Sequence, residues 1–328
     1  MTSSATVAGA VVIGRNEGER LKRCLASLMD QGVRTVYVDS GSTDGSVVYA
    51  RGLGVEVVEL DTATPFTAAR GRNAGFAALA ASGPLPEYVQ FIDGDCVVVP
   101  GWIAAALAHI DAHPDLGIVT GWRSETDRNR SIYNAMCDFE WHRPAGPIKA
   151  CGGDMMVRAQ RFAELGGFNP RVIAAEDDEF CVRMRRSGLG IERLPMAMTR
   201  HDANMTRFSE WWRRTVRSGH GFAQVGHLHP DHFRPERRRV WLYGLVLPLV
   251  ALMGLALVGK VAVLAVAALY VMSWLRTTLS LIRMDQAPKE AILHAFFLTL
   301  SKFPNLIGML TYYWRRWREK DMSIIEYK

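Results

Sequence analysis

Short apolar runs alternate with helical spacings over the first hundred residues of the chain. Four runs have the length and β-branched character of buried strands, at residues 10–13, 35–39, 55–60 and 88–92. Between them, apolar residues recur at three- and four-residue intervals, as an amphipathic helix requires. Strands that alternate with helices predict an α/β domain built on a doubly wound, mixed but largely parallel sheet.

Polar residues gather where these strands end. In a doubly wound sheet, ligands bind beyond the carboxyl ends of the strands, so this convergence predicts a binding site there. No GxGxxG follows the first strand and no GxxxxGK[ST] occurs in the sequence, which argues against a dinucleotide dehydrogenase and a P-loop NTPase. The polar strand-end residues are Arg15, Asn16, Glu17, Asp39, Ser40, Asp93 and Asp95.

From Val240 onward the pattern changes, and Leu, Val, Ala, Met and aromatic residues dominate. Residues 240–258 and 261–282 are each long and apolar enough to cross a bilayer, with Gly259 and Lys260 between them. They predict a transmembrane hairpin, and two buried helices of a soluble core are the alternative. Residues 291–320 are expected to form bent helices in the membrane interface rather than a third span.

Charge and cysteine content refine this picture. The net charge is +6, and basic residues concentrate at 213–217, 234–239 and 315–320, beside the apolar part. Such clusters attract anionic lipid head groups, so membrane lipids rather than nucleic acid are the expected partners, with both ends of the hairpin in the cytosol. The five cysteines lack CxxC spacing and suggest reduced, buried thiols, and no signal peptide opens the chain, which agrees with a cytosolic start.

The triplet Asp93-Gly94-Asp95 ends the fourth apolar run. A charge in that place is costly unless it is solvated, paired or bound to a metal. Carboxylate oxygens suit Mg²⁺ or Mn²⁺, which take further ligands from phosphate and water. Gly94 lets a bulky ligand approach the backbone closely. A surface turn is the alternative, but the position beside other polar strand ends favours a metal–diphosphate site.

Six segments occur in the order and spacing of family 2 glycosyltransferases, and the chain resembles that family over about residues 8–205. The resemblance implies a GT-A fold and a nucleotide-sugar donor. The segments are VVIGRNEGERLKRCLASL, VYVDSGSTDGS, ARGRNAGF, FIDGDCVVVPGW, CGGDMMVRAQRFAELGGFN and AEDDEFCVRMRRSG.

The resemblance also implies roles for single residues. Asp95 would be the main metal ligand, and Asp93 would meet the ribose or the metal. Many relatives carry two acidic residues where this chain has Asp39 and Ser40. Which of these residues contacts the base, and whether that base is uracil, therefore stay open. Arg72 would contact the base or the diphosphate. The nucleotide pocket after the first strand would be lined by Ile13, Arg15 and Glu17.

Three further features are candidates for the donor site. Gly152 and Gly153 precede an apolar strand, and bare backbone there can lie along a sugar or acceptor, with Asp154 available for sugar hydroxyls; a hairpin turn is the alternative. His201 follows a probable strand and is a candidate third metal or phosphate ligand, or a structural histidine. Arg207 is a candidate donor contact in a segment that only distantly resembles the QxxRW motif of processive synthases, so one sugar per acceptor is expected.

Residues 176–179 place four carboxylates at the start of a predicted helix. The helix dipole, and an i, i+4 pair between Glu179 and Arg183, would explain some of these carboxylates but not all four. Inversion at a sugar needs a base for the acceptor hydroxyl, and carboxylates near one another can have raised pKa values. In the family the second residue of the ED pair is the base, which selects Asp177 over Glu176. Helical geometry predicts that Asp178 turns away from the site.

Together these observations predict a GT-A domain at residues 1–230 and a membrane region at 231–328. The expected enzyme is an inverting glycosyltransferase, dependent on Mn²⁺ or Mg²⁺, that moves a sugar from a nucleotide-sugar, with UDP favoured, to a lipid-linked or membrane-proximal glycan acceptor. It would lie on the cytoplasmic face of a bacterial inner membrane and serve exopolysaccharide or other envelope glycan assembly. The alternatives are a polyprenyl-phosphate sugar transferase and an inactive nucleotide-sugar-binding scaffold.

Overall fold

The computed structural model describes residues 7–320, 322 and 323 of the chain. These residues form two compact units. The first extends to Arg130 and resumes over Glu140–Asn204, and the second contains Ser131–Phe139 and the residues from Met205 onward. The change of unit after Asn204 comes earlier than the boundary predicted at residue 230, because the helix that follows packs within the second unit.

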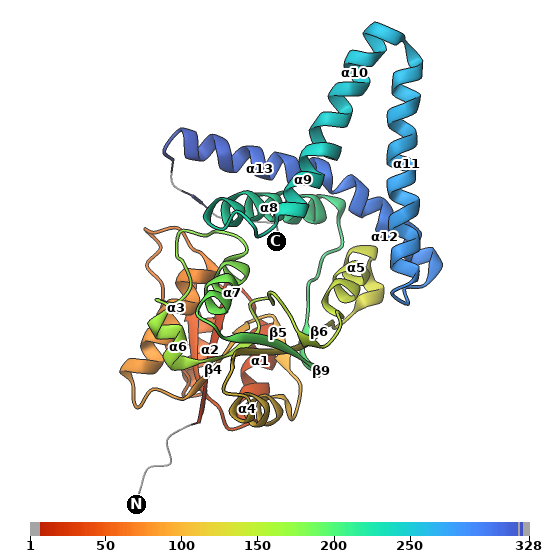
Figure 1. Cartoon of the computed structure of the whole chain (residues 1–328). Coiled ribbons are helices and arrows are strands. Elements are labelled where there is room, and N and C mark those ends of the chain that lie inside the picture. The colour runs from red at the N-terminus through yellow and green to blue at the C-terminus, as the bar shows by residue number, and fades with distance from the viewer. Residues whose placement is uncertain (1–6, 321, 324–328) are drawn as a thin grey trace, which may run out of the picture. The chain divides into compact units, whose positions relative to one another are not determined.

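The first unit is built on one mixed sheet, in which the described residues form nine strands (Figure 1). The strand order is β3-β2-β1-β4-β8-β6-β9-β5, and β7 pairs with β9. The pairs β1–β2, β1–β4, β2–β3 and β6–β9 are parallel, and the others are antiparallel. The strands are β1 (Ala8–Gly14), β2 (Arg34–Asp39), β3 (Glu56–Glu59), β4 (Tyr88–Asp93), β5 (Cys96–Val98), β6 (Leu116–Glu125), β7 (Gly146–Pro147), β8 (Met155–Arg158) and β9 (Gly190–His201).

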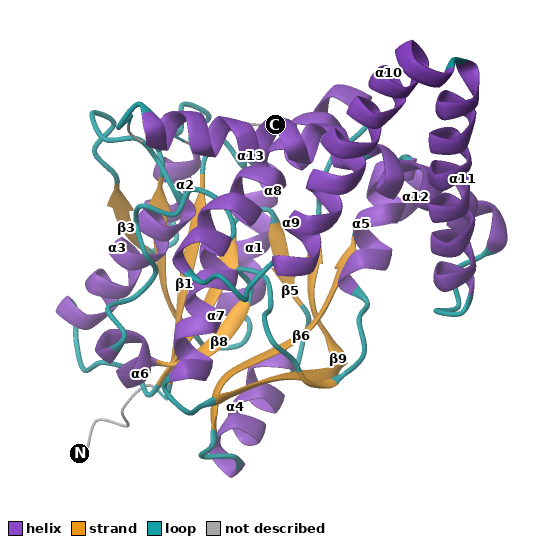
Figure 2. Cartoon of the chain, turned by 45° about the horizontal axis from the view of Figure 1, so that its top comes forward, coloured by secondary structure: helices purple, strands orange, loops and turns teal. Residues whose placement is uncertain are grey.

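Helices cover both faces of this sheet (Figure 2). One face packs against α1, α2 and α4, and the other against α3, α6 and α7, so every central strand is buried on two sides. This arrangement confirms the predicted α/β class with a mixed sheet. The helices are α1 (Glu19–Met29), α2 (Ser46–Gly52), α3 (Ala68–Ala81), α4 (Trp102–Ala112), α6 (Ala159–Glu164) and α7 (Glu176–Arg186), with a short 3₁₀ turn at Arg128–Arg130.

The carboxyl ends of β1, β2 and β4 meet at one edge of the sheet. Ile13 pairs with Asp93, and Gly14 pairs with Asp39, so the polar residues after these strands start from adjacent positions. The strand order changes direction between β1 and β4, which is where a doubly wound sheet opens a crevice for ligands.

The second unit is helical. The helix α5 (Ile132–Trp141) begins in this unit, and its last two residues belong to the first. Gly219 and Gly308 let α8 and α13 pack with little space between them, since a Cβ at Gly308 would lie 1.9 Å from the carbonyl oxygen of Val216. The other elements are α8 (Phe208–Leu228), α9 (Arg234–Trp241), a π-helical turn (Leu242–Val246), α10 (Leu247–Val258), α11 (Lys260–Ile282), α12 (Pro288–Leu300) and α13 (Lys302–Trp317).

Within the described residues, three helical stretches are long and apolar enough to cross a membrane. Two of them, Arg234–Val258 and Lys260–Ile282, correspond to the predicted hairpin, and Gly259 turns between them with φ 71°. The third, Pro288–Trp317, qualifies by length and composition, although half of its most apolar window is buried inside the protein. The expected interfacial placement of residues 291–320 therefore stays a prediction.

Candidate active site

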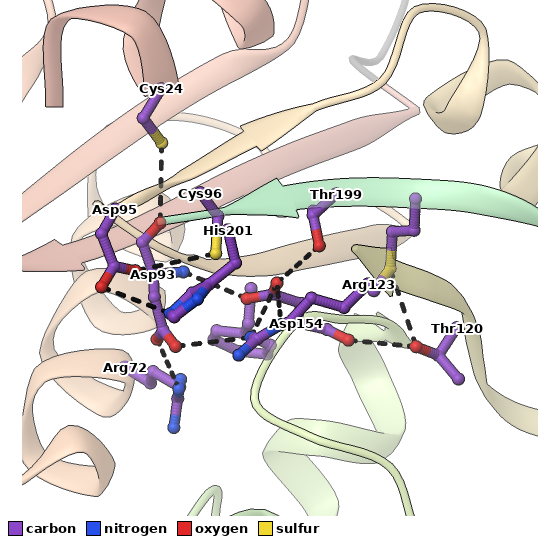
Figure 3. Close-up of polar contacts among 12 residues, drawn as sticks. Cys24, Arg72, Asp93, Asp95, Cys96, Thr120, Arg123, Asp154, Thr199 and His201 are labelled. Carbon is purple, nitrogen blue, oxygen red and sulfur yellow. Dashed lines mark hydrogen bonds and ion pairs between the residues drawn. The ribbon is translucent and has the colours of Figure 1, made fainter. Parts of the chain in front are cut away.

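Asp95 and His201 are brought together by strand pairing. Strand β5 runs antiparallel to β9 and sets Cys96 opposite His201. The Asp95 carboxylate lies 3.4 Å from Nε2 of His201, and both residues are buried. Asp95, Cys96 and His201 offer ligand atoms within 4.8 Å of one another, which identifies them as a group able to hold a metal ion (Figure 3).

The imidazole of His201 is held between acidic groups. Its Nδ1 is buried and makes no hydrogen bond within the described part of the chain, and it lies 3.6 Å from the Glu125 carboxylate. Burial by itself lowers the pKa of His201, but Asp95 and Glu125 outweigh burial and raise this pKa above its usual value. Carboxylate oxygen and imidazole nitrogen are donors that Mn²⁺ and related cations accept, so these residues fit the expected cofactor.

Asp93 faces arginines instead of the metal-ligand group. Its carboxylate lies 2.7 Å from the guanidinium of Arg72 and 3.5 Å from that of Arg123. Burial raises the pKa of Asp93, but the two arginines outweigh it and hold the pKa below its usual range. Asp93 is therefore an ionised carboxylate fixed by two arginines, and its contact with the ribose or the metal stays a prediction.

Asp154 joins three elements beneath this site (Figure 3). Its carboxylate accepts hydrogen bonds from the Arg123 guanidinium at 3.0 Å, from the Thr199 hydroxyl at 2.8 Å and from the backbone N–H of Asp93 at 3.2 Å. Asp154 is 1% exposed. These bonds show that Asp154 fixes Arg123 and the backbone of Asp93, and the expected contact of Asp154 with sugar hydroxyls stays a prediction.

Arg72 connects two acidic residues of the site. Its guanidinium bonds Asp93 on one side and the Glu176 carboxylate, at 2.6 Å, on the other. Gly153 leaves the room for it, because a Cβ at Gly153 would lie 2.0 Å from Nη2 of Arg72. The expected close approach at Gly153 is thus made by a protein side chain. Glu176 is buried in this ion pair, which leaves it poorly placed to act as a base.

Asp177 lines a cavity of about 230 Å³ in the first unit. Burial, followed by the charges of Glu176 and Asp178, raises the pKa of Asp177 well above its usual value. The expectation that Asp178 turns away is wrong, since Asp178 lines the same cavity. Both belong to the first turn of α7, and the end of this helix, rather than one flank, borders the cavity. The remaining lining residues are Thr120, Gly121, Arg123, Glu140, Trp141, Ala150, Cys151, Gly152, Asp154, Arg193 and Met198.

Several of these residues carry no sequence motif. Trp141 lies edge-on against His201, with ring centroids 4.9 Å apart, and also under the guanidinium of Arg123 at 5.3 Å. The sequence does not indicate Arg123, because its partners are distant in the chain: Asp93 ends β4, and Asp154 immediately precedes β8. Cys96 was not a candidate from the sequence, because nothing in it predicts that β5 pairs with β9 and brings Cys96 beside His201.

The residues after β1 and β2 form the remaining part of the strand-end site. Asp39 is 1% exposed and caps its own turn, since it accepts hydrogen bonds from the backbone N–H groups of Gly41 and Ser42 and from the Tyr37 hydroxyl. Arg15 is exposed, with its guanidinium over Phe66. The remaining candidates here are Ile13 and Glu17, both partly buried, Ser40, which donates its backbone N–H to Gly14, and Gly94, which donates its own to Ile13.

Arg207 belongs to the second unit. It is the N-cap residue of α8 and takes part in a capping box with Glu210. This local role accounts for its position, and its assignment as a donor contact stays a prediction.

The sheet topology, the strand-end carboxylates and the neighbouring cavity fit the class of glycosyltransferase domains that the sequence resembles. Residues 10–158 match the family model described as Glycosyl transferase family 2, and residues 131–207 match one described as N-terminal domain of galactosyltransferase. Over residues 10–158, somewhat less than half of its length, the chain is thus similar to glycosyl transferase family 2.

A curated relative is similar in sequence, and a solved structure is similar in fold. The relative is the Pre-mycofactocin glycosyltransferase of Mycobacterium tuberculosis, 24% identical over 239 residues that make up 69% of this chain and 48% of the relative. The chain thus spans about half the length of that relative. The structure is the mannosyltransferase PcManGT of Pyrobaculum calidifontis, in complex with GDP-Man and Mn²⁺, with TM-score 0.62 and 18% identity over 96% of this chain and 89% of that one. The likeness shows the fold.

Proposed function

We propose that this chain is an inverting, metal-dependent glycosyltransferase that moves a sugar from a nucleotide-sugar donor to a lipid-linked or membrane-proximal glycan acceptor. The observation that carries the proposal is the pairing of Asp95 with His201 beside a cavity bordered by Asp177. This transfer needs a cation that stabilises the leaving diphosphate. It also needs a base for the acceptor hydroxyl, which a carboxylate with a raised pKa can supply.

The donor side would be held by the strand-end residues. Asp95 and His201 would hold Mn²⁺ or Mg²⁺, and the bound cation supplies positive charge to the departing diphosphate. Asp93, fixed by Arg72 and Arg123, would accept hydrogen bonds from the ribose. The relative from P. calidifontis was solved with GDP-Man and Mn²⁺, so GDP-sugars belong in a donor screen beside the UDP-sugars we favour.

On the acceptor side, Asp177 would act as the base. It takes the proton of the acceptor hydroxyl while that oxygen attacks the anomeric carbon, and the bond to the nucleotide diphosphate breaks on the opposite face. The raised pKa of Asp177 supports this role, because a base is most effective when its pKa is near the working pH. Glu176 would hold Arg72 in place rather than accept the proton.

The acceptor would reach the site from a membrane. Three helical stretches of the second unit are apolar enough to cross a bilayer. Basic residues occur at the start of the first stretch, at 234–239, and at the end of the third, at 315–320. Basic residues on this side of a hairpin favour a catalytic domain at the cytoplasmic face, in bacteria that of the inner membrane. Envelope glycan or exopolysaccharide assembly is the role we infer.

A donor screen tests the proposal. The full chain in detergent is given UDP- and GDP-sugars with Mn²⁺ or Mg²⁺ and a bacterial membrane lipid extract, and released nucleoside diphosphate is measured. We expect one donor class to be turned over with a cation, and product NMR to show the inverted anomer. Cation-independent release or a retained configuration would contradict the proposed mechanism, and a fully active Asp177→Asn variant would favour a polyprenyl-phosphate acceptor, which needs no base.

A further inference from the structure

Cys96 lies in the group with Asp95 and His201, although neither motif nor family resemblance gives it a role. Its Sγ lies 3.7 Å from one oxygen of the Asp95 carboxylate, whose other oxygen lies 3.4 Å from Nε2 of His201. All three side chains are less than a tenth exposed. Figure 3 shows the thiol and the imidazole approaching the same carboxylate.

Each of these two separations has the length of a donor–donor edge in a tetrahedral coordination shell, and one ligand atom from each of the three residues lies within 4.8 Å of the others. Zinc-type cations lie about 2.0–2.2 Å from oxygen and nitrogen and about 2.3 Å from sulfur. With tetrahedral angles, these bond lengths put neighbouring donor atoms roughly 3.3–3.7 Å apart. An octahedral Mg²⁺ shell, with bonds of about 2.0–2.1 Å at right angles, would need donors near 3 Å apart.

We propose that Cys96 is a thiolate ligand of the cation held by Asp95 and His201, so that the site prefers Zn²⁺, Co²⁺ or Cd²⁺ more strongly than an oxygen–nitrogen site does. This inference rests on the proposed metal-dependent function. Binding replaces the S–H bond with a sulfur–metal bond, and the thiol proton passes to solvent. A soft sulfur donor raises affinity for these cations and contributes little to Mn²⁺ or Mg²⁺.

A structural role is the competing explanation, because Cys96 also packs in the apolar cluster beneath α1 and α4. Cys24 provides the matched comparison. It is equally buried in the same cluster, and its Sγ lies 3.8 Å from the backbone oxygen of Asp93, outside the metal-ligand group.

The test is spectroscopic. The full chain in detergent, without donor, is titrated with Co²⁺ and Cd²⁺ while the near-ultraviolet sulfur-to-metal charge-transfer band is recorded. We expect a band that saturates at one cation per chain, disappears in Cys96→Ala and persists in Cys24→Ala. In competition titrations, the ratio of Zn²⁺ to Mn²⁺ affinity should fall at least about tenfold in Cys96→Ala, on the scale of losses at ligand-supporting residues.

A wild type without a sulfur band would exclude every cysteine as a ligand, however well the variants fold, and a band that Cys24→Ala keeps and Cys96→Ala loses assigns the ligand to Cys96. Cation binding that requires Asp95 but shows no sulfur band would overturn the assignment, as would a band that survives in Cys96→Ala. Sugar transfer with Mn²⁺ and no sulfur band would leave the proposed function standing. A sulfur band without transfer from any donor would contradict the function and leave the ligand set intact.

Discussion

The two units of the chain differ in which side chains they bury and which they expose. In the first, charged residues are buried and paired, as Arg72 is between Asp93 and Glu176 with a side chain 3% exposed. In the second, large apolar residues face outward, with Leu257 80% and Val261 70% exposed. Buried charges need partners within the protein, whereas a large exposed apolar surface indicates a partner or a lipid phase. We therefore place the proposed sugar transfer in the first unit and the proposed membrane attachment in the second.

The largest effect is expected at Asp95. Asp95→Ala should remove the cation site and lower turnover by at least about a hundredfold, because cation stabilisation of a leaving diphosphate contributes several kcal/mol. Titration of a nucleoside diphosphate in the presence of Mn²⁺ measures the accompanying loss of affinity. The control is Asp202→Ala, a partly exposed carboxylate beside the site whose side chain lies 4.0 Å from that of Arg23. Equal cation-dependent affinity in wild type and Asp95→Ala would contradict the metal assignment.

A matched glycine pair tests the packing of the site. Gly153→Ala should lower the free energy of unfolding by about 1–3 kcal/mol, the usual cost of overpacking, because its Cβ would displace the pinned Arg72 guanidinium. Gly152→Ala should change stability by less than about 0.5 kcal/mol, since its Cβ meets nothing nearer than the Asp177 carboxylate at 4.0 Å. Thermal or denaturant unfolding in detergent measures both. Equal losses would mean that Arg72 is not fixed as described.

The pH dependence of turnover should follow Asp177. A base must be ionised, and burial together with Glu176 and Asp178 raises the pKa of Asp177, so turnover should rise with pH through a value above that of an ordinary aspartate. Asp178→Asn removes one neighbouring negative charge and should move this acidic limb to lower pH. Profiles of kcat against pH for the two proteins measure the shift. A limb that does not move would assign the ionisation to another group.

The smallest effect on sugar transfer is expected from a test of membrane topology, which changes only the second unit. Reporter fusions at the C-terminus and in the Gly259–Lys260 turn should lie on opposite sides of the membrane, since the hairpin crosses twice and the Pro288–Trp317 stretch is expected in the interface. Both reporters outside would show that this stretch crosses as a third span. Either result leaves the chemistry of the first unit unchanged.

The elements of the first unit could be predicted because their signals are local. The apolar run that ends at Ile92 and the polar residues after it are sufficient to predict β4 and its carboxylates. The partners of those carboxylates could not be predicted. Arg123 reaches Asp154 only because β6 and β8 pair in one sheet, and His201 reaches Asp95 only through the pairing of β5 with β9. Such contacts depend on strand order, which residue patterns do not determine.

The assignment of chemistry to the first unit is tested most directly by one paired measurement on Asp177→Asn, namely donor affinity and kcat in the same preparation. We predict an unchanged donor Kd, because Asp177 would contact the acceptor and not the diphosphate, and a kcat at least about a hundredfold lower, as loss of a general base causes. Asp178→Asn, which borders the same cavity, should retain most of its kcat. An Asp177→Asn variant with wild-type kcat, or a larger loss in Asp178→Asn, would contradict the assignment of the base.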